Sequence, residues 1–97
     1  MRCVTRNHRC RGGEIDLVML AADTLVFVEV RYRRGTRFGT AAETIDTRKQ
    51  QRIVHAAQHF LMLHHEFANS PCRFDVIALY GDARAPGCDW IAGAFSA

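Results

Sequence analysis

The sequence predicts an α/β fold, in which a long crossover helix connects strands of a mixed β-sheet. Three observations support this prediction: two apolar segments joined by a short link, one long segment with helical periodicity, and a further apolar segment after it. The expected order β-β-β-α-β-β places a single helix between strands, so the helix should pack on one face of the sheet. With 97 residues, the chain should form one domain spanning residues 1–97.

The first pair of strands is expected at residues 14–20 (EIDLVML) and 25–31 (LVFVEVR), which are rich in branched and aromatic side chains. The link between them has the length of a turn, so the two segments should form a β-hairpin. Both faces of this hairpin are apolar, and such a sheet needs cover on both sides. One helix covers one side, so we expect that an N-terminal helix is missing from this chain, or that a second subunit of a homodimer supplies the other layer.

The remaining elements follow from periodicity and from turn residues. Apolar residues recur at steps of three and four from about Thr44 to Phe67, which predicts one amphipathic helix with Thr44 or Asp46 as N-cap. Residues 31–43 are rich in Arg and Gly and should form a loop. Later strands are expected at residues 74–80 and 89–95, and a weakly alternating first strand at residues 3–7.

Composition limits the classes of function. No apolar run approaches the roughly 20 residues that cross a bilayer, and no signal core follows the first arginines, so we expect a cytoplasmic chain that does not enter a membrane. Four scattered cysteines favour neither a zinc site nor disulfides. The net charge is +3, and four arginines lie close together, a pattern that suits a polyanion, although a solvated basic loop would look the same: Arg31, Arg33, Arg34 and Arg37.

The hairpin brings charged residues together. Counting back from a turn between residues 22 and 23 sets Asp16 opposite Glu29 and Glu14 opposite Arg31, and all four should share one face. Two like charges directly opposed, with Cβ atoms about 5 Å apart, destabilise a sheet. A Mg²⁺ or Mn²⁺ ion would remove this cost, because such ions take one or two carboxylates and complete their shell with water and phosphate. The alternative is a set of edge-strand charges that meet solvent or pair with Arg31.

These residues carry a resemblance to a known family. The runs GGEIDLV and FVEVRYR resemble the D…(E/D)-x-K signature of the PD-(D/E)XK nuclease superfamily, and the wider pattern is similar to the YraN family of uncharacterised, endonuclease-like bacterial proteins. The pattern extends over nearly the whole chain: Asn7, Arg9, residues 13–16 (GEID), residues 27–31 (FVEVR), Arg33, Thr44, Lys49 and residues 73–77 (RFDVI).

The resemblance implies a restriction-endonuclease-like fold with Asp16 and Glu29 as ligands of Mg²⁺ or Mn²⁺. It puts Arg31 in the place of the motif lysine, a substitution that is not conservative at a site that positions water, and Lys49 near the helix start is the candidate to compensate. Glu14 belongs to the same catalytic set. The family usually has an N-terminal helix that carries a further acidic residue, and this chain begins about where that helix should end.

Six basic residues are candidates for contact with nucleic acid, because they would line one rim if the loop folds over the start of the helix: Arg33, Arg34, Arg37, Arg48, Lys49 and Arg52. Two other sets are expected to be structural. The helix histidines should be satisfied or exposed, and Asp75, inside a strand, should hydrogen-bond on the face opposite its neighbours.

The leading hypothesis is a metal-dependent endonuclease-like protein that hydrolyses phosphodiester bonds in DNA, including branched DNA. The first alternative is a nucleic-acid-binding module of the same fold that has lost cleavage. The second is a small α/β protein-interaction domain, in which a partner covers the exposed apolar face.

Overall fold

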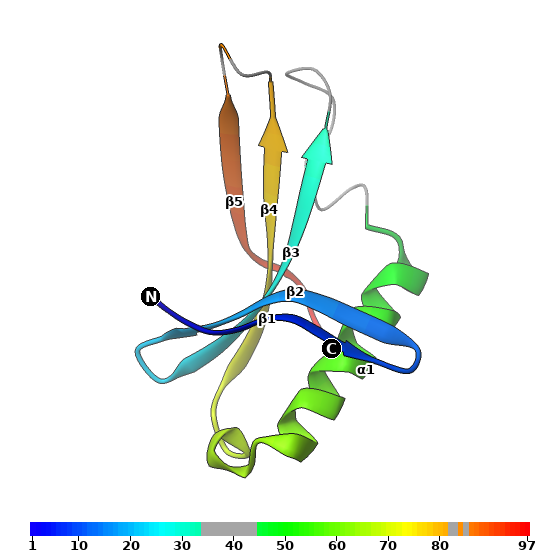
Figure 1. Cartoon of the computed structure of the whole chain (residues 1–97), viewed down its shortest axis with the longest axis vertical. Helices are drawn as coiled ribbons and strands as arrows, with labels where there is room; N and C mark the ends of the chain where they lie inside the picture. The colour runs from blue at the N-terminus through cyan, green and yellow to red at the C-terminus, as the bar shows by residue number, and fades with distance from the viewer. Residues whose placement is uncertain (34–44, 82–83, 85) are drawn as a thin grey trace.

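The computed structural model describes residues 1–33, 45–81, 84 and 86–97, which form a five-stranded sheet with one α-helix and a short 3-10 helix (Figure 1). The elements are β1 Arg2–Cys10, β2 Gly13–Ala21, β3 Thr24–Arg33, α1 Thr47–Leu63, η2 His65–Phe67, β4 Cys72–Tyr80 and β5 Gly87–Phe95. The strands follow one another in chain order, and all pairs are antiparallel except β3 with β4. The predicted α/β fold with a mixed sheet is confirmed, and it is consistent with a restriction-endonuclease-like fold.

The hairpin of β2 and β3 has the predicted register near its turn. Leu20 pairs with Leu25, and the connection is the two residues Ala22 and Asp23, with Ala22 at a positive φ of 54°. The ladder ends at the pair Leu17 and Val28, so the first four residues of β2 are not paired with β3. In Figure 1 β1 and β2 run across the direction of β3, β4 and β5. The first half of β2 therefore leaves β3, so the expected opposition of Glu14 and Arg31 is wrong.

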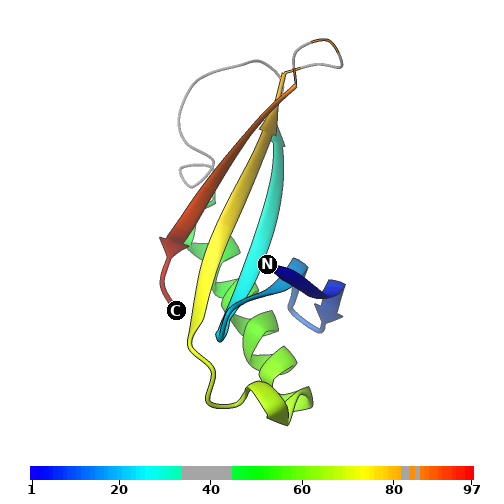
Figure 2. The ribbon, with the colours of Figure 1, turned by 90° about the vertical axis from the view of Figure 1, so that its left-hand side faces the viewer.

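Helix α1 packs on one face of the sheet, as predicted. Its buried side chains Ile53, Ala56 and Phe60 form one core with the odd-numbered residues of β3, among them Leu25 and Phe27. The rings of Phe27 and Phe60 meet edge to face, with centroids 6.0 Å apart. Figure 2 shows α1 behind the strands, with no helix in front of them in the described part of the chain. None of the helices described is long and apolar enough to cross a membrane.

One of the two predicted N-caps of the helix is confirmed, whereas the C-terminal end differs from the prediction. Asp46 is the N-cap and accepts a hydrogen bond of 2.8 Å from the backbone N–H of Lys49, so the helix begins at Thr47, and Thr44 lies outside the described residues. Continuation to Phe67 is wrong, because His64 leaves the helical conformation at φ −127° and ψ 79°. Its imidazole donates to the carbonyl oxygen of Phe60 at 2.9 Å. This local hydrogen bond competes with the helical backbone and ends α1.

The second face of the sheet is only partly open. Val26 and Val28 are fully buried although no helix of the described residues covers them, and the half-buried Leu17 and Met19 lie on the same face as their cross-strand partners. The expectation that this whole face needs another layer is therefore wrong for the hairpin. On β5 Trp90 remains 46% exposed.

Candidate functional site

Asp16 lies where β2 separates from β3. Its Oδ2 accepts a hydrogen bond of 2.8 Å from the backbone N–H of Val30. This contact lies just beyond the last backbone pair of the ladder, so the carboxylate satisfies a strand N–H after the backbone of β2 has turned away. The half-buried side chain is thereby held beside β3, one residue from Glu29.

Glu29 is the buried partner of Asp16, with only 5% of its surface exposed. Burial, together with the side-chain hydrogen bond and the charge of the Asp16 carboxylate, raises the pKa of Glu29 to about 7. Lys49 acts in the opposite direction: its Nζ lies 3.3 Å from Glu29 Oε2. This contact is an ion pair, and within the described residues Oε2 has no well-aligned hydrogen bond. The two carboxylates thus converge, as the sequence predicts, and one buried oxygen is left unsatisfied.

Glu14 and Arg31 do not meet. Glu14 pairs with Arg9 of the neighbouring strand β1, with 3.2 Å between Arg9 Nε and Glu14 Oε2. Arg31 stands two residues beyond Glu29 on β3 and therefore on the same face of that strand. Across the ranges that the structure covers, Arg31 forms no ion pair. The cation next to the carboxylates is Lys49 of α1, which the sequence offers as the substitute for the motif lysine.

The ligand set fits a hard divalent cation that brings its own water. Two carboxylates, one of which has a buried oxygen without a hydrogen bond, match the way in which Mg²⁺ or Mn²⁺ is held, with water and phosphate completing the shell. No cluster of three or more His, Cys, Asp or Glu side chains suited to a metal occurs in the parts of the chain described. The site therefore does not have the three or four side-chain ligands typical of zinc.

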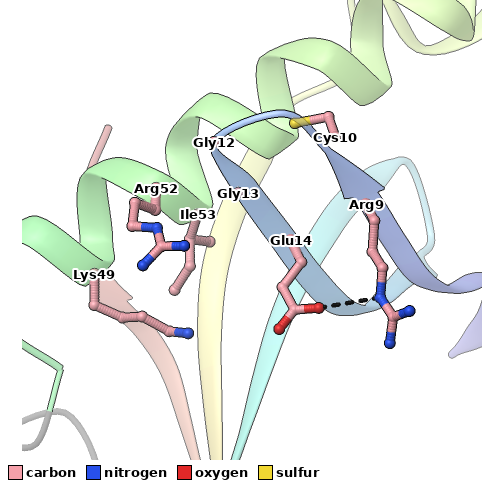
Figure 3. A pocket seen from close by; sticks show the side chains of 8 residues that line it. All are labelled: Arg9, Cys10, Gly12, Gly13, Glu14, Lys49, Arg52 and Ile53. Atoms are coloured by element: carbon pink, nitrogen blue, oxygen red, sulfur yellow. Dashed lines mark hydrogen bonds and ion pairs between the residues drawn. The ribbon is translucent and has the colours of Figure 1, made fainter.

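Basic residues gather around the start of α1. Lys49 and Arg52 line a cavity of about 250 Å³ (Figure 3). Arg48 lines a more open hollow of about 440 Å³, to which Arg52 also contributes. Arg34 and Arg37 lie outside the described residues. For Arg33 only the backbone, at the end of β3, is described. Three of the six predicted phosphate-binding residues thus share one surface.

The β1–β2 turn is the part of this surface that the sequence did not single out for binding. Gly12 has φ +92°, and a Cβ on Gly13 would collide with the backbone carbonyl oxygen of Arg52. These glycines let the turn approach α1 closely, and this approach places Arg9 at the cavity. The Gly-Gly pair was the available signal, because adjacent glycines before a strand indicate a turn with close backbone contact.

The other polar groups have structural partners. His8 and His59 share a ring hydrogen bond of 3.0 Å between β1 and α1, and His55 Nε2 contacts the carbonyl oxygen of Arg11 at 3.0 Å. Asp75 is completely buried and accepts hydrogen bonds from Trp90 Nε1 at 2.7 Å and from the backbone of Gly93 at 2.9 Å. The predicted structural role of Asp75 is confirmed.

Comparison with known proteins gives consistent matches. Residues 1–79 match the model of a family described as "Uncharacterised protein family UPF0102". The chain is 54% identical to a UPF0102 protein of Stutzerimonas stutzeri (strain A1501), over 98% of this chain and 79% of that protein. It is 56% identical to a UPF0102 protein of Pseudomonas putida (strain W619), over 98% of this chain and 78% of that protein. A relative from Saccharophagus degradans is 52% identical, over 96% and 75%.

Proposed function

The chain belongs to the uncharacterised protein family UPF0102, and we propose that it is a metal-dependent endonuclease-like protein that hydrolyses phosphodiester bonds in DNA. The single observation that carries this proposal is that the buried Oε2 of Glu29 has an ion pair with Lys49 but no hydrogen bond within the described residues. A buried carboxylate oxygen without a hydrogen bond is costly, and native proteins keep few of them. A divalent cation held jointly with Asp16 would remove this cost.

The surrounding groups suit phosphoryl chemistry. When bound, Mg²⁺ or Mn²⁺ would supply a Lewis acid that stabilises the charge developing on the scissile phosphate. Asp16 is fixed by the Val30 N–H, so its orientation is set before a substrate arrives. The Lys49 ammonium beside Glu29 can donate to a phosphate oxygen or orient an attacking water. Arg31 follows on the same face as a second cation for the substrate backbone.

DNA is the proposed substrate because the basic surface at the start of α1 adjoins the carboxylates. Lys49 belongs to both, since it contacts Glu29 and lines the cavity. A polyanion that contacts Arg48 and Arg52 would therefore pass close to Asp16 and Glu29. The cleavage of branched DNA should be compared with the cleavage of linear duplex DNA.

The test is cleavage of linear and branched DNA by the full chain with Mg²⁺, with Mn²⁺ and with chelator. Asp16→Asn and Glu29→Gln should each reduce the cleavage rate by at least about 100-fold, since a preorganised electrostatic group contributes on that order. The matched controls are Asp23→Asn in the exposed β2–β3 turn and Glu66→Gln in η2, which should cleave normally. Cleavage that survives both site variants, or that needs no metal, would contradict the proposal.

A second candidate, a binding module without cleavage, rests on a different observation. Lys49 already places a positive charge 3.3 Å from Glu29, so the carboxylate pair is partly neutralised by the protein itself. A chain that relies on this ion pair should bind DNA in chelator, and the Asp16→Asn variant should keep that affinity. The affinity for DNA should fall steeply as the salt concentration rises. The absence of salt-dependent affinity would favour a protein-interaction domain.

A further inference from the structure

The cavity of about 250 Å³ between the β1–β2 turn and α1 has an unusual set of walls (Figure 3). Arg9 and Glu14 enter it from the two strands, and Lys49 and Arg52 enter it from the helix. Typical sites for whole small molecules begin at about 300 Å³ and are mostly apolar. This cavity is smaller and strongly polar, so it suits one charged group of a larger ligand.

Its charge balance favours an anion. Three cationic side chains, Arg9, Lys49 and Arg52, share the cavity with one carboxylate, Glu14, which leaves a formal charge of +2. Lys49 is engaged with Glu29 and Arg9 with Glu14. Arg52 forms no ion pair within the described ranges, although its guanidinium points into the hollow. The positive formal charge of the cavity and the unpaired Arg52 guanidinium both suit the binding of a phosphate group.

The backbone makes this arrangement specific. The collision that a Cβ on Gly13 would cause with the Arg52 carbonyl oxygen shows how closely the turn and the helix approach. The backbones that carry Arg9 and Arg52 are therefore held at a fixed separation, and the exposed side chains can converge from them on one ligand. The helix start contributes less, because the Asp46 carboxylate already caps it.

We propose that this cavity binds one phosphate group of the nucleic acid through Arg9 and Arg52, and that Glu14 acts as its competing counter-ion. The proposal rests on the proposed function, because it places this phosphate beside the one that lies at Asp16 and Glu29. Both side chains of the Arg9–Glu14 pair are well exposed, at 73% and 49%. Such pairs contribute little stability, so Arg9 is readily transferred from Glu14 to a phosphate.

This assignment gives Glu14 a role opposite to that of Asp16 and Glu29. A metal ligand helps the substrate to bind, whereas a counter-ion competes with it. Removing the charge of Glu14 should therefore tighten the binding of phosphate. The sign of this one effect separates the two roles.

The first experiment titrates inorganic phosphate into the full chain in chelator, at constant ionic strength made up with chloride. Arg9→Gln and Arg52→Gln should each weaken binding by about 10-fold, on the scale of a charge-assisted hydrogen bond. Glu14→Gln should tighten it by about 3-fold or more. Arg6→Gln, an exposed arginine of β1 outside the cavity, is the matched control and should change binding by less than about 2-fold. Equal effects of Arg6→Gln and Arg52→Gln, or weaker binding by Glu14→Gln, would overturn the proposal.

The second experiment identifies the source of the phosphate. Oligonucleotides with a 5′-phosphate and with a 5′-hydroxyl are compared by anisotropy, again in chelator. A gain from the 5′-phosphate that Arg52→Gln abolishes assigns the cavity to a strand end. Equal affinities that Arg52→Gln lowers alike assign it to the internal backbone. An Arg52→Gln chain that binds both oligonucleotides like the wild type would overturn the proposal.

The two proposals fail separately. If the cavity variants change nothing while cleavage still requires Asp16 and Glu29, only the cavity assignment is lost. If phosphate binds as described but no DNA is bound or cut, the nuclease proposal is lost and the cavity belongs to another phosphate-bearing ligand. Circular dichroism and thermal unfolding of each variant show that it is folded, which is expected because Arg9, Glu14 and Arg52 are exposed.

Discussion

Two buried carboxylates lie on opposite faces of the same sheet, and they are satisfied in opposite ways. Asp75, on β4, faces away from α1 and accepts hydrogen bonds from Arg73, Trp90 and the Gly93 N–H. Glu29, on β3, faces α1 and keeps one oxygen without a hydrogen bond. Both are at least 95% buried. Burial of a charge therefore does not identify a functional site here, whereas an unsatisfied oxygen does point to one.

The difference originates in the local backbone. The pairing of β4 with β5 shifts between Phe74 and Val76, and Gly93 there has φ +61°. This irregularity turns the Gly93 N–H toward Asp75. On the other face, the departure of β2 from β3 delivers only the Asp16 carboxylate, which is itself an acceptor. One irregularity supplies donors and the other supplies a second negative charge.

The largest expected change in the free energy of unfolding comes from Asp75→Ala. The substitution leaves Arg73, Trp90 and the Gly93 N–H without their buried acceptor, and breaking such a network costs about 3 to 5 kcal/mol. Urea denaturation measures the loss. Asp23→Ala in the exposed β2–β3 turn is the control and should cost less than about 0.5 kcal/mol. Similar losses in the two variants would remove the distinction between the structural carboxylate and the exposed one.

The second effect is metal-dependent stability, which should depend on Glu29. Mg²⁺ or Mn²⁺ at about 100 times its Kd should stabilise the wild type by about 2.7 kcal/mol, because it binds only the folded chain. Thermal unfolding with and without metal should show no such gain in Glu29→Gln or Asp16→Asn. Glu14→Gln should keep the full gain. An equal gain in Glu29→Gln would mean that the metal binds elsewhere.

The third effect is the pH dependence of the metal-free chain. Burial, together with Asp16, raises the pKa of Glu29 to about 7 from an ordinary value of 4.5. The folded chain therefore binds more protons at Glu29 than the unfolded chain between these values, so the contribution of Glu29 to stability is greatest below pH 4.5 and falls as the pH rises toward 7.

Glu29→Gln removes this titration. Its free energy of unfolding, measured in chelator, should match the wild type near pH 4 and exceed it by about 3 kcal/mol at pH 8. Glu66→Gln, at an exposed glutamate of η2, is the control and should follow the wild type at both values. A constant difference between Glu29→Gln and the wild type would show that Glu29 does not titrate in this range.

Sequence reasoning located the central pair because its geometry depends on one turn. Once the turn at Ala22 and Asp23 is identified, counting residues back along both strands sets Asp16 near Glu29. The alternation of side chains along a strand then puts both on one face, and the structure has the expected register at Leu20 and Leu25. The mixed sheet and the single crossover helix follow from periodicities of two and about 3.6 in the same way.

Other features depend on contacts that no local pattern encodes. The ladder of β2 and β3 ends early because β2 turns to pack against α1, whose residues lie more than thirty positions later in the chain. The same turn moves Glu14 from Arg31 to Arg9. The break at His64 depends on a single imidazole that reaches the Phe60 carbonyl oxygen. Periodicity alone does not contain this side-chain choice.

The smallest expected effect on stability concerns His8, a half-buried ionisable side chain whose hydrogen-bond partner is another histidine. Its ring shares a hydrogen bond of 3.0 Å with His59, an arrangement that requires one ring to donate and the other to accept. Burial lowers the pKa of His8 from 6.5, and the charges of His59 and His64 lower it further. The unfolded chain therefore binds more protons than the folded chain just below pH 6.5, so stability should fall as the pH falls through this range.

His8→Gln should reduce this loss by a few degrees of Tm between pH 7.5 and 5.5, whereas His65→Gln on the exposed η2 should leave it unchanged. If the slope of Tm against pH is the same in His8→Gln as in the wild type, the half-buried histidine pair contributes no pH dependence to stability.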